Sequence, residues 1–152
     1  MSLAALSSAF AKNSIEVGVV VDSREAAIVR VGELLAASGR TTAAYTSEML
    51  GVLDELGPYF VIAPGIAIAH ARPSESVLSA GLSLAVLASP IEFGSDHNDP
   101  VRLVFGLCAK DHDGHIEVLA ALAEVLSDDA MVNFLLNAPD AARIHDFLAS
   151  GL

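Results

Sequence analysis

Residues 64 to 73 read PGIAIAHARP, and this stretch decides the fold of the chain around it. Its first two residues, Pro64 and Gly65, predict a tight turn, because proline fixes φ and glycine permits positive φ. The apolar residues that follow predict a short strand over 66–69. His70 stands at the end of that strand, and Arg72 follows two residues later.

His70 shares a predicted strand face with Ile66 and Ile68, so its imidazole continues a buried row at the end of that row. We expect it to be half covered. One ring nitrogen could then be fixed by a hydrogen bond while the other acts as a nucleophile, since an imidazole ordinarily titrates at about 6.5. The spacing alone nevertheless favours a structural histidine over a reactive one.

Strand patterns in the middle of the chain are flanked by helical patterns. The strand patterns span 15–21, 59–63, 66–69, 82–87 and 101–107. The helical patterns cover 4–10, Asp22 to Gly39 with a capping box at Asp22 and Glu25, Thr41 or Thr42 to Leu56, 115–126, 131–136 and 144–148. We therefore predict a single α/β domain over residues 1–152, with a β-sheet covered by helices on both faces.

The composition agrees with that architecture. Apolar residues make up 53% of the 152 residues and aromatic residues only 5%, so the core must consist mainly of Ala, Val, Leu and Ile. The only cysteine, Cys108, lies in an apolar run and is expected to fill the core. The oligomeric state stays open, and the apolar composition is compatible with a homodimer.

The charge excludes one class of partner. The formal net charge is −11, from 19 carboxylates against 8 basic residues, and binding a phosphate backbone requires clustered Lys and Arg instead. We predict no nucleic acid partner. The sequence also lacks a secretory signal pattern and an apolar run long enough to span a membrane, so we expect a cytoplasmic location.

His115 is the second candidate for function. Asp111, Asp113 and Gly114 place it in the first turn of a predicted helix, where the partial positive charge disfavours imidazolium and free backbone N–H groups suit an anion. A neutral His115 there could hold a phosphoryl group. A histidine that only caps or packs against its helix stays equally open.

Other chemistries find less support. His112, Asp113 and His115 could suggest a metal site, but this cluster is expected to lie largely in the loop before the helix, so we predict none. The sequence has no Walker loop, no GxSxG motif and no paired cysteines, and we predict no cofactor. His97 and His145 are expected to be solvated surface residues.

Two longer stretches carry a family resemblance. They are GPYFVIAPGIAIAHARP at 57–73 and PIEFGSDHNDPVRLVFGLCAKDHDGH at 90–115, followed by a leucine-rich helix. Together they resemble the enzyme IIA domains of the sugar phosphotransferase system, mannitol/fructose class, and most closely the ascorbate-type branch. The resemblance covers nearly the whole chain and implies a mixed sheet with helices on both faces.

The resemblance also implies roles for both histidines. The histidine matching His70 accepts a phosphoryl group from the histidine-containing phosphocarrier protein and passes it to a cysteine of a IIB component, which serves a membrane IIC component. The histidine matching His115 helps to hold the phosphoryl group. The implied activity is that of a protein histidine phosphoryl carrier, for ascorbate or a related substrate.

Two positions depart from the family pattern. Many relatives have proline before the active histidine, where this chain has Ala69. Mannitol-type members carry an arginine roughly where this chain has Val52 or Leu53. Because a phosphoryl group in transfer carries charge on three oxygens, we predict that Arg72 supplies the missing cation. The alternative for Arg72 is a surface charge paired with Glu75.

Two other functions stay open at this point. The chain could be a regulatory phosphoacceptor that is not coupled to transport. It could also be a non-catalytic α/β binding module in which both histidines are structural.

Overall fold

The computed structural model describes residue 6 and residues 8–150 of the chain. Much of the helix predicted over 4–10 lies outside the described residues. Phe10, its predicted last residue, instead begins the first strand, β1 (Phe10–Val19). The strand predicted over 15–21 therefore starts earlier in the sequence than its β-branched pattern indicates, and it ends two residues sooner.

Five strands form one mixed sheet in the order β1-β4-β5-β3-β2. The other strands are β2 (Val61–Ala63), β3 (Ile66–His70), β4 (Gly81–Ile91) and β5 (Val101–Cys108). The pairs β1–β4 and β3–β5 are parallel, whereas β4–β5 and β2–β3 are antiparallel. This arrangement confirms the predicted mixed sheet.

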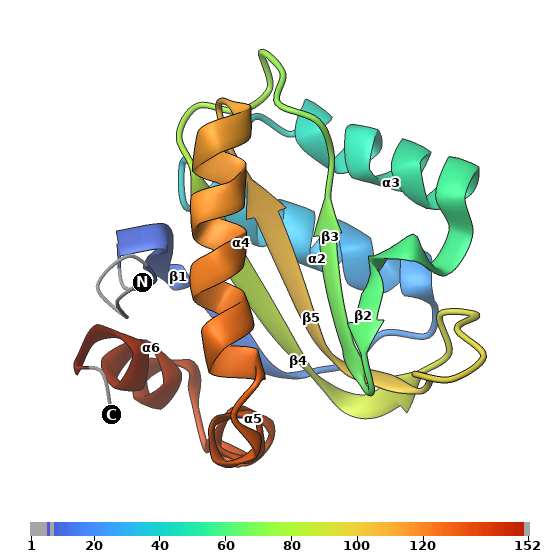
Figure 1. The fold of residues 1–152 in the computed structure, drawn as a ribbon, viewed down its shortest axis with the longest axis vertical. Helices are drawn as coiled ribbons and strands as arrows, with labels where there is room; N and C mark the ends of the chain where they lie inside the picture. The colour runs from blue at the N-terminus through green and yellow to red at the C-terminus, as the bar shows by residue number, and fades with distance from the viewer. Residues whose placement is uncertain (1–5, 7, 151–152) are drawn as a thin grey trace.

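Helices cover both faces of the sheet, as predicted (Figure 1). One face packs against α2 (Arg24–Ala37) and α3 (Ala44–Leu56). The other face packs against α4 (His112–Leu126), α5 (Asp129–Asn137) and α6 (Ala141–Ser150). Within the described part of the chain, no helix is both long and apolar enough to cross a membrane.

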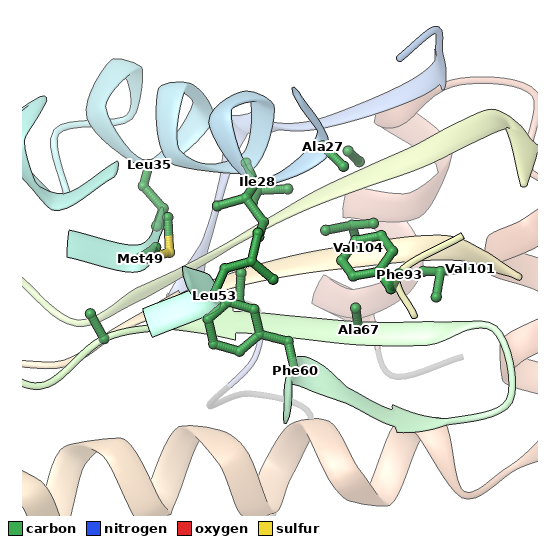
Figure 2. Close-up of a cluster of buried hydrophobic side chains, with 14 of the residues drawn as sticks. Ala27, Ile28, Leu35, Met49, Leu53, Phe60, Ala67, Phe93, Val101 and Val104 are labelled. Carbon is green, nitrogen blue, oxygen red and sulfur yellow. The ribbon is translucent and has the colours of Figure 1, made fainter. Parts of the chain in front are cut away.

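The alternation along β3 assigns its side chains to two separate cores. Ala67 packs with Ile28 of α2 and Leu53 of α3 in the cluster drawn in Figure 2. Ile66 and Ile68 belong to the opposite cluster, beneath α4. The predicted two-faced strand is therefore confirmed, and His70 follows at its end.

The starts of three elements differ from the sequence predictions. The N-cap of α2 is Ser23, whose hydroxyl accepts from the Ala26 N–H at 3.1 Å, and not Asp22. Helix α3 begins at Ala44 because Thr41 pairs with Val77 in an isolated β-bridge. The strand predicted from residue 59 starts at 61, since 57–60 form a short 3₁₀ helix.

The loop before β5 holds in place the turn that precedes β3. The Asp99 carboxylate accepts three backbone N–H groups, from residues 93, 94 and 95, at 2.7–3.1 Å. The neighbouring Asn98 carbonyl accepts from the Gly65 N–H at 2.8 Å, and Gly65 adopts the φ of +76° that glycine tolerates. The segment Asn98 to Val101, which reads NDPV, thus fixes the end of β3 that lies opposite His70.

Candidate functional site

One open pocket brings the three predicted site residues together. It has a volume of about 820 Å³, and His70, Arg72 and His115 all line it. The imidazole rings of His70 and His115 lie 5.3 Å apart between centroids. They come from different elements, since His70 ends β3 and His115 lies in the first turn of α4.

His70 is held by the main chain of its own strand. Its Nδ1 lies 3.0 Å from the carbonyl oxygen of Ile68, two residues earlier. A carbonyl oxygen can only accept a hydrogen bond, so Nδ1 carries the proton of the neutral ring. Nε2 is then the unprotonated nitrogen, with a lone pair available for attack.

Aromatic rings support the His70 imidazole from the side of the 3₁₀ helix. The Phe60 ring, which is fully buried, lies 5.4 Å from the imidazole between centroids, and the exposed Tyr59 ring lies 5.9 Å away. Phe60 links His70 to the core, whereas Tyr59 also lines the pocket. The half-covered position expected for His70 is confirmed.

A buried tyrosine fixes the chain immediately after His70. The Tyr45 hydroxyl accepts from the Ala71 N–H at 2.9 Å and lies 2.7 Å from the Leu107 carbonyl, to which it donates. Its side chain extends from α3 beneath the ends of β3 and β5. Burial raises the pKa of Tyr45 above its ordinary value, so the hydroxyl keeps its proton and remains a donor.

The start of α4 positions His115. The Asp111 carboxylate caps the helix by accepting from the Gly114 N–H at 2.7 Å, and the Asp111 carbonyl accepts from the His115 N–H at 3.1 Å. The pKa of His115 is lowered, first by partial burial and then by the nearby His70 and His112. A neutral His115 offers a pocket anion one N–H donor.

Arg72 lies in the loop after β3 and is exposed. It lines the pocket, and no ion pair with Glu75 is found in the part of the chain that the structure describes. Glu48 of α3 holds this loop in place. Its carboxylate accepts from the Ser74 hydroxyl at 2.7 Å and from the Ser76 hydroxyl.

Of the two positions where the resemblance implied a lost arginine, only one faces the site. Val52 lines the pocket, whereas Leu53 is buried in the core and 2% exposed. Arg72 is the only Lys or Arg among the described residues that line the pocket.

Several residues that line the pocket were not predicted from the sequence. His112 and Asp113 were expected in the loop before α4, but both lie in its first helical turn, and His112 lines the pocket. The offset of three between His112 and His115 is the signal that could have placed both on one side of the helix. Among the described residues, no group of three or more His, Cys, Asp or Glu side chains is arranged to hold a metal ion.

The remaining candidates lie away from the pocket. His97 is exposed in the loop before β5, as expected, but His145 is half buried on α6 rather than solvated. Cys108 is fully buried, and burial raises the pKa of its thiol to about 11. The prediction that Cys108 fills the core is confirmed.

Comparison with known proteins decides the family. Residues 8–151 match the family model for "Phosphoenolpyruvate-dependent sugar phosphotransferase system, EIIA 2". The chain belongs to this EIIA family. An ascorbate-specific PTS system EIIA component of Salmonella typhimurium is 35% identical over 122 residues, which cover 79% of each chain. A mannitol-specific cryptic phosphotransferase enzyme IIA component of Escherichia coli is 38% identical over 96 residues, or 62% of this chain and 64% of that protein.

Solved structures agree with this EIIA assignment. The solution structure of the mannitol-specific cryptic enzyme IIA from Escherichia coli matches with a TM-score of 0.85 and 32% identity, over 96% of this chain and 99% of that one. The mannitol enzyme IIA in complex with phosphorylated enzyme IIB, from the same organism, matches with a TM-score of 0.81 and 25% identity, over 93% and 97%. The protein is therefore an EIIA component of a sugar phosphotransferase system.

Proposed function

We propose that this EIIA component carries a phosphoryl group on Nε2 of His70. The observation that carries the proposal is the contact between Nδ1 and the Ile68 carbonyl, which leaves Nε2 as the unprotonated ring nitrogen. The position of the ring at the end of a strand, beside an open pocket, supports the same role.

In the proposed reaction, Nε2 attacks the phosphorus of a phosphohistidine on the histidine-containing phosphocarrier protein. The P–N bond to the carrier breaks as the P–Nε2 bond of His70 forms, and Nδ1 keeps its proton. The His115 N–H and the Arg72 guanidinium would stabilise the charge on the phosphoryl oxygens. Donor and acceptor are both protein side chains, so the proposed mechanism needs no metal or nucleotide.

The acceptor in the second half-reaction is a cysteine of a IIB component. Its thiolate attacks the phosphorus, the P–Nε2 bond breaks, and Nε2 regains its lone pair. One similar protein was solved in complex with a phosphorylated enzyme IIB, which supports a IIB acceptor here. Exposed apolar side chains beside the site, Leu56, Tyr59 and Ile116, suit short-lived docking of such partners.

The proposed substrate of the whole system is ascorbate or a related compound. The support is the likeness to ascorbate-specific relatives, including one from Escherichia coli that is 43% identical over 91 residues, or 59% of each chain. Transfer from the phosphorylated protein to IIB components of ascorbate and of mannitol systems would separate the two types. Faster transfer to the mannitol IIB would overturn the ascorbate assignment.

A regulatory role is the second candidate. A nitrogen regulatory protein IIA from Neisseria meningitidis matches with a TM-score of 0.78 and 26% identity, over 93% of this chain and 97% of that one. A protein with this role would become phosphorylated on His70 but would pass no phosphoryl group to any IIB component.

Incubation with phosphoenolpyruvate, enzyme I and the carrier protein tests the central proposal. We expect one phosphate per chain, in a linkage that is labile in acid and stable in base. His70→Ala should abolish the labelling, and His97→Ala, which changes an exposed histidine outside the pocket, should preserve it. If the wild-type protein takes up no phosphate, the chain is a non-catalytic module.

A further inference from the structure

A third histidine, His112, lines the same pocket as His70 and His115. It is the first residue of α4, and His115 follows three positions later, so both side chains leave the helix on one side. The two rings differ in solvation, since His112 is exposed and His115 is partly buried. His112 lies close enough to His115 to contribute to the lowering of the His115 pKa, after burial and His70.

The fixed charges of the pocket do not suit a phosphoryl group. Two carboxylates, Glu48 and Glu55 of α3, line it together with one guanidinium, Arg72. Asp111, the N-cap of α4, and Asp113 in its first turn lie on either side of His112 in the sequence. A phosphoryl group brings roughly two further negative charges, so its arrival calls for more positive charge than Arg72 alone supplies.

His112 and His115 differ in how readily each can supply positive charge to the phosphoryl group. Protonating His115 is opposed by its partial burial and by His70 beside it. An exposed imidazole such as His112 remains hydrated when it gains a proton, so its charging carries little desolvation cost. An anion placed near such an imidazole stabilises its protonated form.

We propose that His112 takes up a proton from solvent when His70 is phosphorylated and, as imidazolium, contacts the phosphoryl oxygens at the mouth of the pocket. This inference rests on the proposed function of His70. Neutral His115 then donates one N–H, while His112 adds a charge that the fixed residues do not supply. Phosphorylation is thereby coupled to proton uptake, and low pH favours the phosphorylated protein.

NMR titration of the histidine rings, before and after phosphorylation by phosphoenolpyruvate, enzyme I and the carrier protein, tests the coupling. The His112 titration should move to higher pH by about 0.5–1 unit, because an opposite charge nearby favours the protonated ring. His97, which is exposed outside the pocket, serves as the internal reference and should not move. An unmoved His112 in a protein phosphorylated on His70 overturns this inference and leaves the proposed function intact.

A variant supplies the second measurement. His112→Gln keeps a polar side chain but cannot be charged, and it should slow phosphoryl transfer about threefold to tenfold at about pH 6.5, with the difference shrinking towards about pH 9. His97→Gln should match the wild type throughout. A pH profile for His112→Gln that parallels the wild type contradicts the inference. A wild-type protein that takes up no phosphate overturns both proposals.

Discussion

The Nδ1 atom of His70 lies 3.0 Å from the carbonyl oxygen of Ile68, so the strand that carries the imidazole also selects its tautomer. The selection needs no second side chain.

The phosphoryl group should be attached to Nε2 of His70 and not to Nδ1. Nδ1 is already bound to the Ile68 carbonyl, and only the other nitrogen has a free lone pair. Long-range correlation of ring protons and nitrogens in the ¹⁵N-labelled phosphoprotein distinguishes the two isomers. A phosphate on Nδ1 would show that the imidazole flips, and so breaks its contact with the Ile68 carbonyl, before it reacts.

Arg72→Ala should slow phosphoryl transfer about 10- to 100-fold while leaving the fold intact, because the variant loses a charged donor for the phosphoryl oxygens. Single-turnover transfer from the phosphorylated carrier measures the effect, and Arg72→Lys should recover part of the rate. Arg143→Ala removes an exposed arginine of α6 and is the control. An unchanged rate in Arg72→Ala would remove Arg72 from the site.

Tyr45→Phe should lower the free energy of unfolding by about 1–3 kcal/mol, because it leaves the Ala71 N–H and the Leu107 carbonyl buried without their partner. It should also slow transfer, since His70 precedes Ala71. Urea unfolding measures the first effect. Tyr59→Phe changes an exposed side chain and should change stability by less than about 0.5 kcal/mol. Equal losses in the two variants would contradict this account.

Substitutions at two helix caps should have similar effects on stability but different effects on phosphoryl transfer. Asp111 caps α4 and Asp128 caps α5, and replacing either by alanine should cost about 0.5–2 kcal/mol of stability. Only Asp111→Ala should also slow phosphoryl transfer, because the first turn of α4 carries His115. Thermal unfolding and the transfer assay are compared for the two variants. If Asp111→Ala and Asp128→Ala slow transfer equally, the prediction that the α4 cap positions His115 is wrong.

The lowered pKa of His115 predicts an acid-dependent loss of stability. In the unfolded chain the imidazole titrates at about 6.5, so below that pH the unfolded state binds more protons than the folded state. Stability should fall as the pH drops from about 6.5 through the folded pKa, with no contribution above that window. His115→Gln should lose this part of the acid dependence, whereas the exposed His97→Gln should keep it.

Urea midpoints at about pH 7.5 and about pH 5.5 measure that dependence over the range in which histidine titrates. A drop in His115→Gln as large as in the wild type would place the acid-sensitive group elsewhere.

The periodicity of the sequence predicted most of the sheet and the layers around it. The alternation of isoleucine and alanine before His70 assigned both faces of β3 correctly, because a strand has a strict period of two. The ends of the helices and strands were less predictable from the sequence. Ser23 and Asp22 are both good helix caps, and only the backbone conformation selects Ser23.

The site was predictable only in part. The positions of His70 and His115 followed from local patterns, since each lies at the end of a recognisable element. The Ile68 carbonyl could not be found in this way, because every residue has one. Tyr45 and Glu48 were also missed, since they reach the site from α3 through contacts between segments that lie far apart in the chain.

The dependence of His70 on a main-chain acceptor has a consequence for mutational tolerance. Every amino acid at position 68 presents the same carbonyl, so no single substitution there deletes the group that orients the nucleophile. Substitution can instead impair the site at the residues that keep the strand in place. Tyr45 does so at one end of β3 and Asp99 near the other. Random mutagenesis with selection for phosphoryl transfer should therefore yield conservative apolar replacements at Ile68 more readily than any replacement at Tyr45.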